Sequence, residues 1–187
     1  MRRKGRCVAG TVSVLAGGVV TAALAGCASS SKGAASWREN GPQASWPVHV
    51  AAASPEAAGK YLVQISGCND CHTPGYSQTN GKTPVSQWLI GQRIGYRGPW
   101  GTTYASNLRL YVAPMSEEDW VHVMRARNDK PPMPWQSLHA MSDRDLRAIY
   151  RFIHSMGKAG EPTPQDLPSG QEPRTPYVVF DPPTAPR

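Results

Sequence analysis

Two cysteines and a histidine fall within five residues of this chain, and no other feature restricts its possible folds as strongly. Cys68 and Cys71 are separated by two residues, and His72 follows directly, in the sequence Cys-Asn-Asp-Cys-His. The other two cysteines, Cys7 and Cys27, both lie near the start of the chain, far from this motif. The fold must therefore present two thiols and an imidazole on one short turn.

The spacing Cys-x-x-Cys-His is that of covalent haem attachment. Two thiols at this spacing can form thioethers with the two vinyl groups of one haem, and the adjacent His72 is then held beside the iron as an axial ligand. This attachment takes place outside the cytoplasm. We therefore predict one covalently bound haem c, held by Cys68, Cys71 and His72.

Two other uses of a Cys-x-x-Cys pair are less well supported. A thioredoxin-like redox pair requires strands that alternate with helices around the motif, and the sequence has no such pattern there. A structural zinc site requires four ligands, and no second Cys-x-x-Cys or His-x-x-x-His pair is present to complete one. Haem is therefore the preferred interpretation.

The segment before Cys27 has the three parts of an export signal. Four cations lie at its very start, an apolar run extends from Val8 to Leu24, and small residues follow it. A transmembrane helix is the alternative for this run, but the run is rich in Gly and Ala and barely long enough to span a bilayer. The sequence Leu24-Ala25-Gly26-Cys27 resembles the lipobox of bacterial lipoproteins, which implies cleavage before Cys27 and lipidation of this cysteine.

Lipidation at Cys27 anchors a protein stably, because two or more acyl chains suffice for membrane binding. Ala28 and not aspartate follows it, which among bacterial lipoproteins favours the outer membrane of a Gram-negative cell. We expect the protein on the periplasmic side of a bacterial membrane. Without the leader the chain carries 16 Lys and Arg against 13 Asp and Glu. Because two haem propionates offset most of this small excess, we expect no nucleic-acid partner.

We expect four segments along the chain. They are a signal peptide over residues 1–26, a lipidated N-terminus and flexible tether over 27–53, a haem domain over 54–157 and a Pro-rich tail over 158–187. The tail should be extended or partly disordered, with its apolar cluster Tyr177–Phe180 docked on the domain.

Capping residues predict three amphipathic helices in the haem domain. They begin at Ser54-Pro55-Glu56, at Ser116 with Asp119, and at Ser142 with Asp145, and they end before Gly67, near Ala126 and at Gly157. Residues 73–109 are rich in glycine and show no helical or alternating pattern, which predicts a long loop.

A haem iron with one protein ligand has an open sixth position, for which the methionines are candidates. Met133 lies in Pro131-Pro132-Met133-Pro134-Trp135, a segment that cannot be helical and is stiffened on both sides. A rigid loop can keep a weak iron–sulfur bond closed, so we predict His72 and Met133 as the axial ligands. The competing candidates lie in or beside predicted helices, or are histidines: Met115, Met124, Met141, Met156, His139 as the next choice, His122 and His154.

These motifs resemble those of the monohaem class I cytochrome c domains, particularly the domains attached to periplasmic dehydrogenases. The resemblance runs from about Pro55 to Met156. It is carried by Gly59-Lys60-Tyr61-Leu62, the Cys68–Thr73 motif, Gly98-Pro99-Trp100-Gly101 with Tyr104 and Asn107, Pro132-Met133-Pro134-Trp135, and the segment from Ser142 to Tyr150.

The resemblance implies an all-α fold, the class I cytochrome c fold, with about three main helices and long loops that wrap one haem. The first and last helices would cross near Gly59 and Tyr150. Trp100, Tyr104 and Asn107 would line the haem and approach its propionates.

Together these features predict an electron carrier and not an enzyme. An iron saturated by His72 and Met133 favours electron transfer, and the partner would be a redox protein such as a dehydrogenase, an oxidase or another cytochrome. The alternative is a peroxidase-like enzyme or a gas sensor, in which Met133 leaves the sixth position open. A third possibility is a structural lipoprotein in which haem only stabilises the fold.

Overall fold

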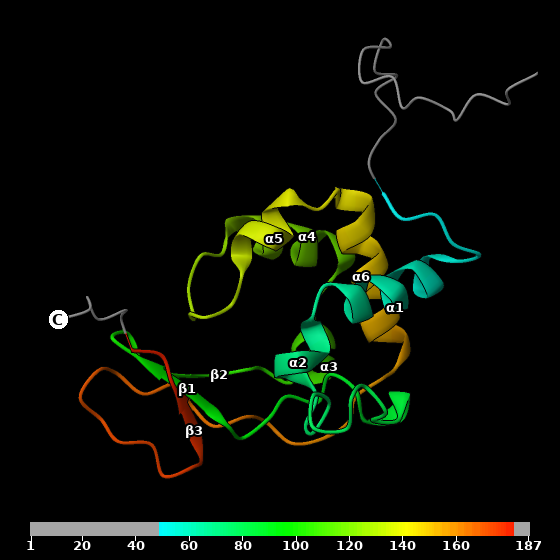
Figure 1. Cartoon of the computed structure of the whole chain (residues 1–187). Coiled ribbons are helices and arrows are strands. Elements are labelled where there is room, and N and C mark those ends of the chain that lie inside the picture. Colours follow the sequence, from blue (N-terminus) through cyan, green and yellow to red (C-terminus); the bar gives the residue numbers. More distant parts are fainter. Residues whose placement is uncertain (1–48, 182–187) are drawn as a thin grey trace, which may run out of the picture. The chain divides into compact units, whose positions relative to one another are not determined.

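The computed structural model describes residues 49–181 of the chain, and Figure 1 shows how its elements are arranged. The described part contains six α-helices and one short 3₁₀ helix. They are α1 (Pro55–Ile65), α2 (Cys68–His72), η1 (Val85–Gln87), α3 (Leu108–Val112), α4 (Glu117–Ala126), α5 (Trp135–Ala140) and α6 (Asp143–Ser155).

The first and last helices, α1 and α6, pack across each other at Gly59. A Cβ atom at this position would lie 2.0 Å from the carbonyl oxygen of Ala148 and 2.8 Å from Cβ of Phe152. Only glycine therefore allows the two backbones to approach this closely. The crossing expected near Gly59 and Tyr150 is confirmed, since Ala148 and Phe152 lie on either side of Tyr150.

The three predicted helices are confirmed, because their capping residues act as the sequence indicates. The side chains of Ser54, Ser116 and Ser142 accept hydrogen bonds from the backbone N–H groups of Ala57, Asp119 and Asp145. The helices α2, α3 and α5, of five or six residues each, were not predicted. Helices this short bury too few residues to show a period.

Contacts between α4 and α6 complete the helical core. The indole N–H of Trp120 donates to the carbonyl oxygen of Leu146 at 2.9 Å. At the surface Glu117 forms ion pairs with Arg151 at 2.6 Å and with Arg147 at 3.1 Å. These bonds fix α4 on α6 beside the crossing with α1.

A three-stranded sheet accompanies the helices, so the prediction of an all-α class I cytochrome c fold is wrong. Its strands are β1 (Gly95–Gly98), β2 (Gly101–Tyr104) and β3 (Tyr177–Val179), in the order β2-β1-β3. β1 and β2 form an antiparallel hairpin inside the segment predicted as a loop, and β3 pairs with β1 in parallel. Strands of three or four residues are too short for an alternating pattern to show.

The C-terminal segment, orange to red in Figure 1, is extended and lies along this sheet. Leu167 forms an isolated antiparallel bridge with Thr102. The expectation that the cluster Tyr177–Phe180 docks on the domain is confirmed, because Tyr177–Val179 forms β3 and the N–H of Phe180 donates to the carbonyl oxygen of Arg97 at 2.7 Å.

Within the described residues, contacts with the domain are also made before its predicted start at residue 54. The N–H of Val50 donates to Oδ1 of Asp145 at 2.8 Å, and the Val50 side chain packs against the core. The predicted signal peptide, the lipidation site Cys27 and most of the tether lie outside the described residues. No helix within residues 49–181 is long and apolar enough to cross a membrane.

Candidate cofactor site

The Cys68–His72 motif forms α2, a single helical turn whose position is fixed by the loop that follows it. The N–H of Gly91 donates to the carbonyl oxygen of His72 at 2.8 Å. The N–H of Leu89 donates to the hydroxyl of Thr73, also at 2.8 Å. The turn that carries the thiols and the imidazole is therefore held in place by hydrogen bonds from Leu89 and Gly91.

This turn borders a cavity that is open to solvent and lined by residues from all six α-helices and from the β1–β2 hairpin. The space between these residues is about 1110 Å³ when the solvent at its opening is counted. Cys68, Cys71, His72 and Met133 all line it. Much of the wall is apolar and comes from Val63, Leu108, Trp120, Leu138, Ile149 and Ile153.

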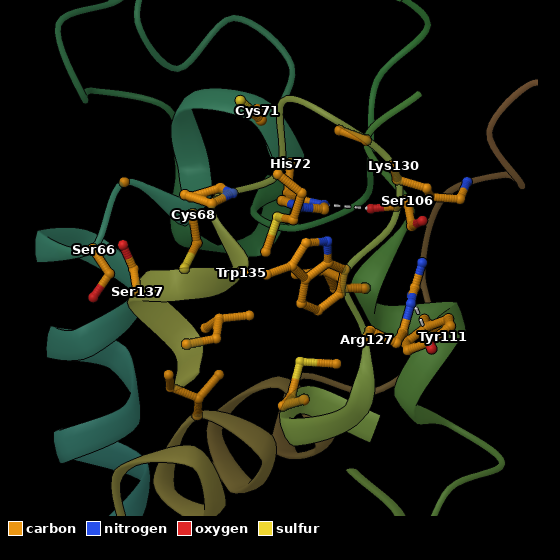
Figure 2. Close-up of a pocket in the computed structure, with 18 of the residues that line it drawn as sticks. Ser66, Cys68, Cys71, His72, Ser106, Tyr111, Arg127, Lys130, Trp135 and Ser137 are labelled. Carbon is orange, nitrogen blue, oxygen red and sulfur yellow. Dashed lines mark hydrogen bonds between the residues drawn. The ribbon is translucent and has the colours of Figure 1, made fainter. Parts of the chain in front are cut away.

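The imidazole of His72 is held in one tautomer. Its Nδ1 lies 2.7 Å from the carbonyl oxygen of Ser106, the contact drawn as a dashed line in Figure 2. Because a carbonyl oxygen only accepts, Nδ1 carries the proton and the lone pair of Nε2 is left for another ligand. Burial lowers the pKa of His72, opposed in part by the Ser106 hydrogen bond, so the ring is neutral at pH 7.

Both thiols are free, and Cys68 is not activated as a nucleophile. Burial raises the pKa of the Cys68 thiol to about 11. A redox-active Cys-x-x-Cys pair has the opposite property, a thiol with a lowered pKa that attacks as thiolate. The site therefore offers little support for the thioredoxin-like interpretation.

The loop that carries Met133 is braced by residues on both sides. The N–H of Met133 donates to the carbonyl oxygen of Lys130 at 3.1 Å, and the N–H of Trp135 donates to that of Met133 at 2.9 Å. The indole N–H of Trp135 donates to the carbonyl oxygen of Asp129. The guanidinium of Arg127 lies 4.7 Å from the centre of the Trp135 ring, which adds a cation–π contact.

The structure reduces the number of other candidate axial ligands. Met124 and Met141 also line the cavity, whereas Met115 and Met156 do not. Of the histidines that the structure describes, only His72 lines it. His139, the next choice from the sequence, lies with Nε2 3.0 Å from the carbonyl oxygen of Arg127. His122 and His154 are exposed on α4 and α6.

Of the three residues expected against the haem, only Tyr104 lines the cavity. Its hydroxyl is 2.8 Å from Oγ1 of Thr175 in the C-terminal segment. The hydroxyl is therefore already engaged by the protein.

Trp100 and Asn107, which the resemblance placed beside the haem, are not among the residues that line the cavity. Their polar groups bind the protein backbone instead. The indole N–H of Trp100 donates to the carbonyl oxygen of Tyr96 at 3.3 Å. The Asn107 side chain caps α3 and donates to the carbonyl oxygen of Ala159 at 2.8 Å. The C-terminal segment thus occupies the amide of Asn107.

Sequence reasoning missed the polar side of the cavity. Figure 2 shows Arg127, Lys130 and Tyr111 together on one side, away from Cys68 and Ser66. No local motif marks these residues, because α3, α4 and the Met133 loop bring them together from separate parts of the chain. For Lys130 the only sequence signal is its position directly before Pro131-Pro132-Met133-Pro134.

Tyr96 of β1 was also missed. It lines the cavity, and its hydroxyl accepts a hydrogen bond from Nε2 of Gln92 at 2.7 Å. Burial, followed by the neighbouring Cys71 thiol, raises the pKa of Tyr96. A tyrosine in a glycine-rich segment gives no sequence signal for this position, which depends on the hairpin.

The donor set fits a haem attached through two thioethers. Cys68 and Cys71 are three residues apart on one helical turn and therefore neighbours on its surface. Together with His72 and Met133 they line one largely apolar cavity. These four residues could hold a haem c and supply both axial ligands of its iron.

Comparisons of the chain with models of protein families, with characterised proteins and with solved structures found no significant match. Within residues 49–181 no group of three or more His, Cys, Asp or Glu side chains is arranged so that it could hold a metal ion. The function of the site is therefore argued from its own residues.

Proposed function

We propose that this chain is an electron carrier that holds one haem c through thioethers at Cys68 and Cys71, with His72 and Met133 as axial ligands. The observation that carries the proposal is that these four residues line a single, largely apolar cavity. Three of them belong to the short helix α2, and the fourth comes from the loop before α5, much later in the chain.

The environment of His72 supports its role as a ligand. The hydrogen bond from Nδ1 to the Ser106 carbonyl orients the ring, fixes the tautomer and increases the electron density at Nε2. Since burial keeps the imidazole neutral, no proton competes for Nε2 at pH 7. The protein thus prepares an imidazole nitrogen that is ready to bind iron.

The environment of Met133 supports the second ligand. Its loop is held by backbone hydrogen bonds and by the Arg127 and Trp135 contacts, so the side chain is presented by a rigid support. Met124 and Met141 are the competing methionines, but Met124 is 4% exposed and packed in the core on α4. Packing is the usual role of a methionine in such a position.

A bound haem would supply a one-electron couple, and histidine–methionine ligation raises its reduction potential and leaves no open coordination position. The apolar wall would limit the contact of the iron with water and so limit reorganisation. Such a site suits the exchange of electrons with another redox protein. We further propose, from the sequence alone, that the protein is exported and anchored by lipid at Cys27 on the periplasmic side of a membrane.

The proposal is tested by optical spectra of the full chain expressed with export and haem-attachment machinery. We expect a covalently bound low-spin haem that does not bind carbon monoxide in the ferrous wild type but binds it in Met133→Ala. Met124→Leu and Met141→Leu, which alter methionines of the same cavity, should behave as the wild type. Absence of haem would refute the proposal. Carbon monoxide binding by the wild type would indicate a haem enzyme or a gas sensor instead.

A further inference from the structure

The C-terminal segment over residues 158–181 is fitted closely to the β1–β2 hairpin. The N–H and carbonyl of Leu167 pair with those of Thr102, both at 2.8 Å. At Gly101, whose φ is +104°, a Cβ atom would lie only 2.1 Å from the carbonyl oxygen of Leu167. Only a glycine at this position leaves room for the segment. The segment is therefore a part of the folded structure.

Asp166 in this segment connects the hairpin to the Met133 loop. Its Oδ1 accepts a hydrogen bond from the N–H of Tyr104 at 3.0 Å. Its Oδ2 lies 2.5 Å from the ammonium nitrogen of Lys130, and both side chains are about one-third exposed. The hydroxyl of Thr103 in β2 also donates to the carbonyl oxygen of Pro131. At the start of the Met133 loop, Lys130 is thus bound by Asp166 and Pro131 by Thr103.

The loop needs such an attachment. Lys130 has a φ of +54°, in the left-handed region that residues with a side chain rarely adopt. A conformation of this kind persists only where surrounding contacts hold it. The Asp166 carboxylate binds the side chain of the residue that carries this strain, three positions before Met133.

The same carboxylate also lies close to the support of His72. Tyr104, whose N–H it binds, is two residues before Ser106, whose carbonyl holds Nδ1 of His72. Figure 2 shows Lys130 beside Ser106 at this side of the cavity. One short backbone segment, residues 104–106, is therefore bonded directly to His72 and, through Asp166, to Lys130 at the start of the Met133 loop.

We propose that Asp166 is a positioning residue, through which the C-terminal segment holds the 130–135 loop so that Met133 stays on the iron. This inference rests on the proposed function, in which Met133 is a ligand. The C-terminal segment then acts as a strap that ties the hairpin to the Met133 loop. Loss of the Asp166 contact would open the sixth coordination position, although Cys68, Cys71, His72 and Met133 would all still be present.

The test uses the haem-loaded full chain with Asp166→Asn, Asp166→Ala and Glu172→Gln. Asp166→Asn removes the charge and keeps an acceptor for the Tyr104 N–H, whereas Asp166→Ala removes both. Glu172→Gln is the matched control, because Glu172 forms an ion pair at 2.6 Å with Arg97 of β1, in the same region but not on the Met133 loop.

Two readouts are compared, the rate of carbon monoxide binding to the ferrous protein and backbone hydrogen exchange in residues 130–135. Carbon monoxide binds only when Met133 leaves the iron, so its rate reports the open fraction. We expect a rise of about fivefold in Asp166→Asn, as for a partly exposed ion pair, and a larger rise in Asp166→Ala. Exchange should rise in parallel. Both readouts should stay within twofold of the wild type in Glu172→Gln.

Unchanged carbon monoxide binding in both Asp166 variants would overturn the inference, even if exchange increased, since the strap would then not position Met133. An equal rise in Glu172→Gln would overturn it too, because the effect would be general loosening. Failure of the proposed function is recognised separately, from a wild type that lacks haem or binds carbon monoxide as fast as Met133→Ala.

Discussion

Replacement of Gly59 by alanine should destabilise the protein, although alanine is the better helix former. In an exposed helix this exchange stabilises by about 1 kcal/mol. Here the new Cβ atom would lie 2.0 Å from the carbonyl oxygen of Ala148 and 2.6 Å from its carbonyl carbon. Ordinary contacts between heavy atoms are about 3.5–4.0 Å, so α1 and α6 must separate by more than about 1 Å.

Backbone atoms cannot rotate away as a side chain can, so we place the cost at or above the upper end of the ~1–3 kcal/mol typical of overpacking. After the gain in helix propensity, a net loss of about 2 kcal/mol remains. The assay is urea unfolding of the mature protein followed by far-ultraviolet circular dichroism. A loss of this size corresponds to a fall in Tm of roughly 4–8 °C.

Ala57→Gly is the control for the effect of helix propensity on stability, because Ala57 is exposed on the same helix two residues earlier. It should lower the free energy of unfolding by at most about 1 kcal/mol. If Gly59→Ala left stability unchanged or increased it, the close crossing of α1 and α6 would be refuted.

Two further predictions concern α4 and α6. Hydrogen bonds from Arg151 and Arg147 lower the pKa of Glu117. Its ion pairs therefore stabilise the fold fully above the unfolded pKa of about 4.3. This stabilisation is lost as the pH falls through the folded pKa. Glu117→Gln should therefore cost about 1 kcal/mol at pH 7, and the difference from the wild type should shrink below about pH 4 in urea unfolding. Tyr150→Phe should lower the free energy of unfolding by about 1–2 kcal/mol, because the tyrosine hydroxyl donates to the carbonyl oxygen of Met115 at 2.6 Å.

Each of these two variants has a control in the same part of the chain. Glu118→Gln removes a far more exposed partner of Arg147, with 74% of the side chain exposed, and should change stability by less than about 0.5 kcal/mol. Tyr61→Phe removes a hydroxyl from an exposed face of α1 and should be equally mild. A pH-independent deficit in Glu117→Gln, or equal losses in Tyr150→Phe and Tyr61→Phe, would contradict the assigned contacts.

The sheet and the C-terminal segment could not have been predicted from local patterns. The composition of Gly95–Gly98 is typical of a turn, and its parallel partner Tyr177–Val179 lies far along the chain, near the end of the described residues. A pairing over this separation leaves no periodic signal in either segment. The all-α expectation failed because it treated this glycine-rich region as a loop around the site.

Side-chain roles in the candidate site were only partly accessible from the sequence. The Cys68–His72 motif and Met133 line the same cavity, as their predicted roles require, whereas Asn107 binds the backbone of the C-terminal segment. Residue type does not distinguish these uses, since an asparagine amide bonds equally well to a propionate or to a backbone carbonyl. The role of Asn107 depends on which acceptor the fold places within hydrogen-bonding distance of its amide.

The sequence by itself determined the starts of three helices and the thiol–imidazole motif, because a cap depends on residues three positions apart and the motif is equally local. Tertiary structure alone decided the close crossing at Gly59, the β1–β3 pairing, the set of methionines that reach the cavity and the Asp166–Lys130 contact. Each of these depends on groups from distant segments, whose distance is set by the packing of the whole domain and not by any local pattern.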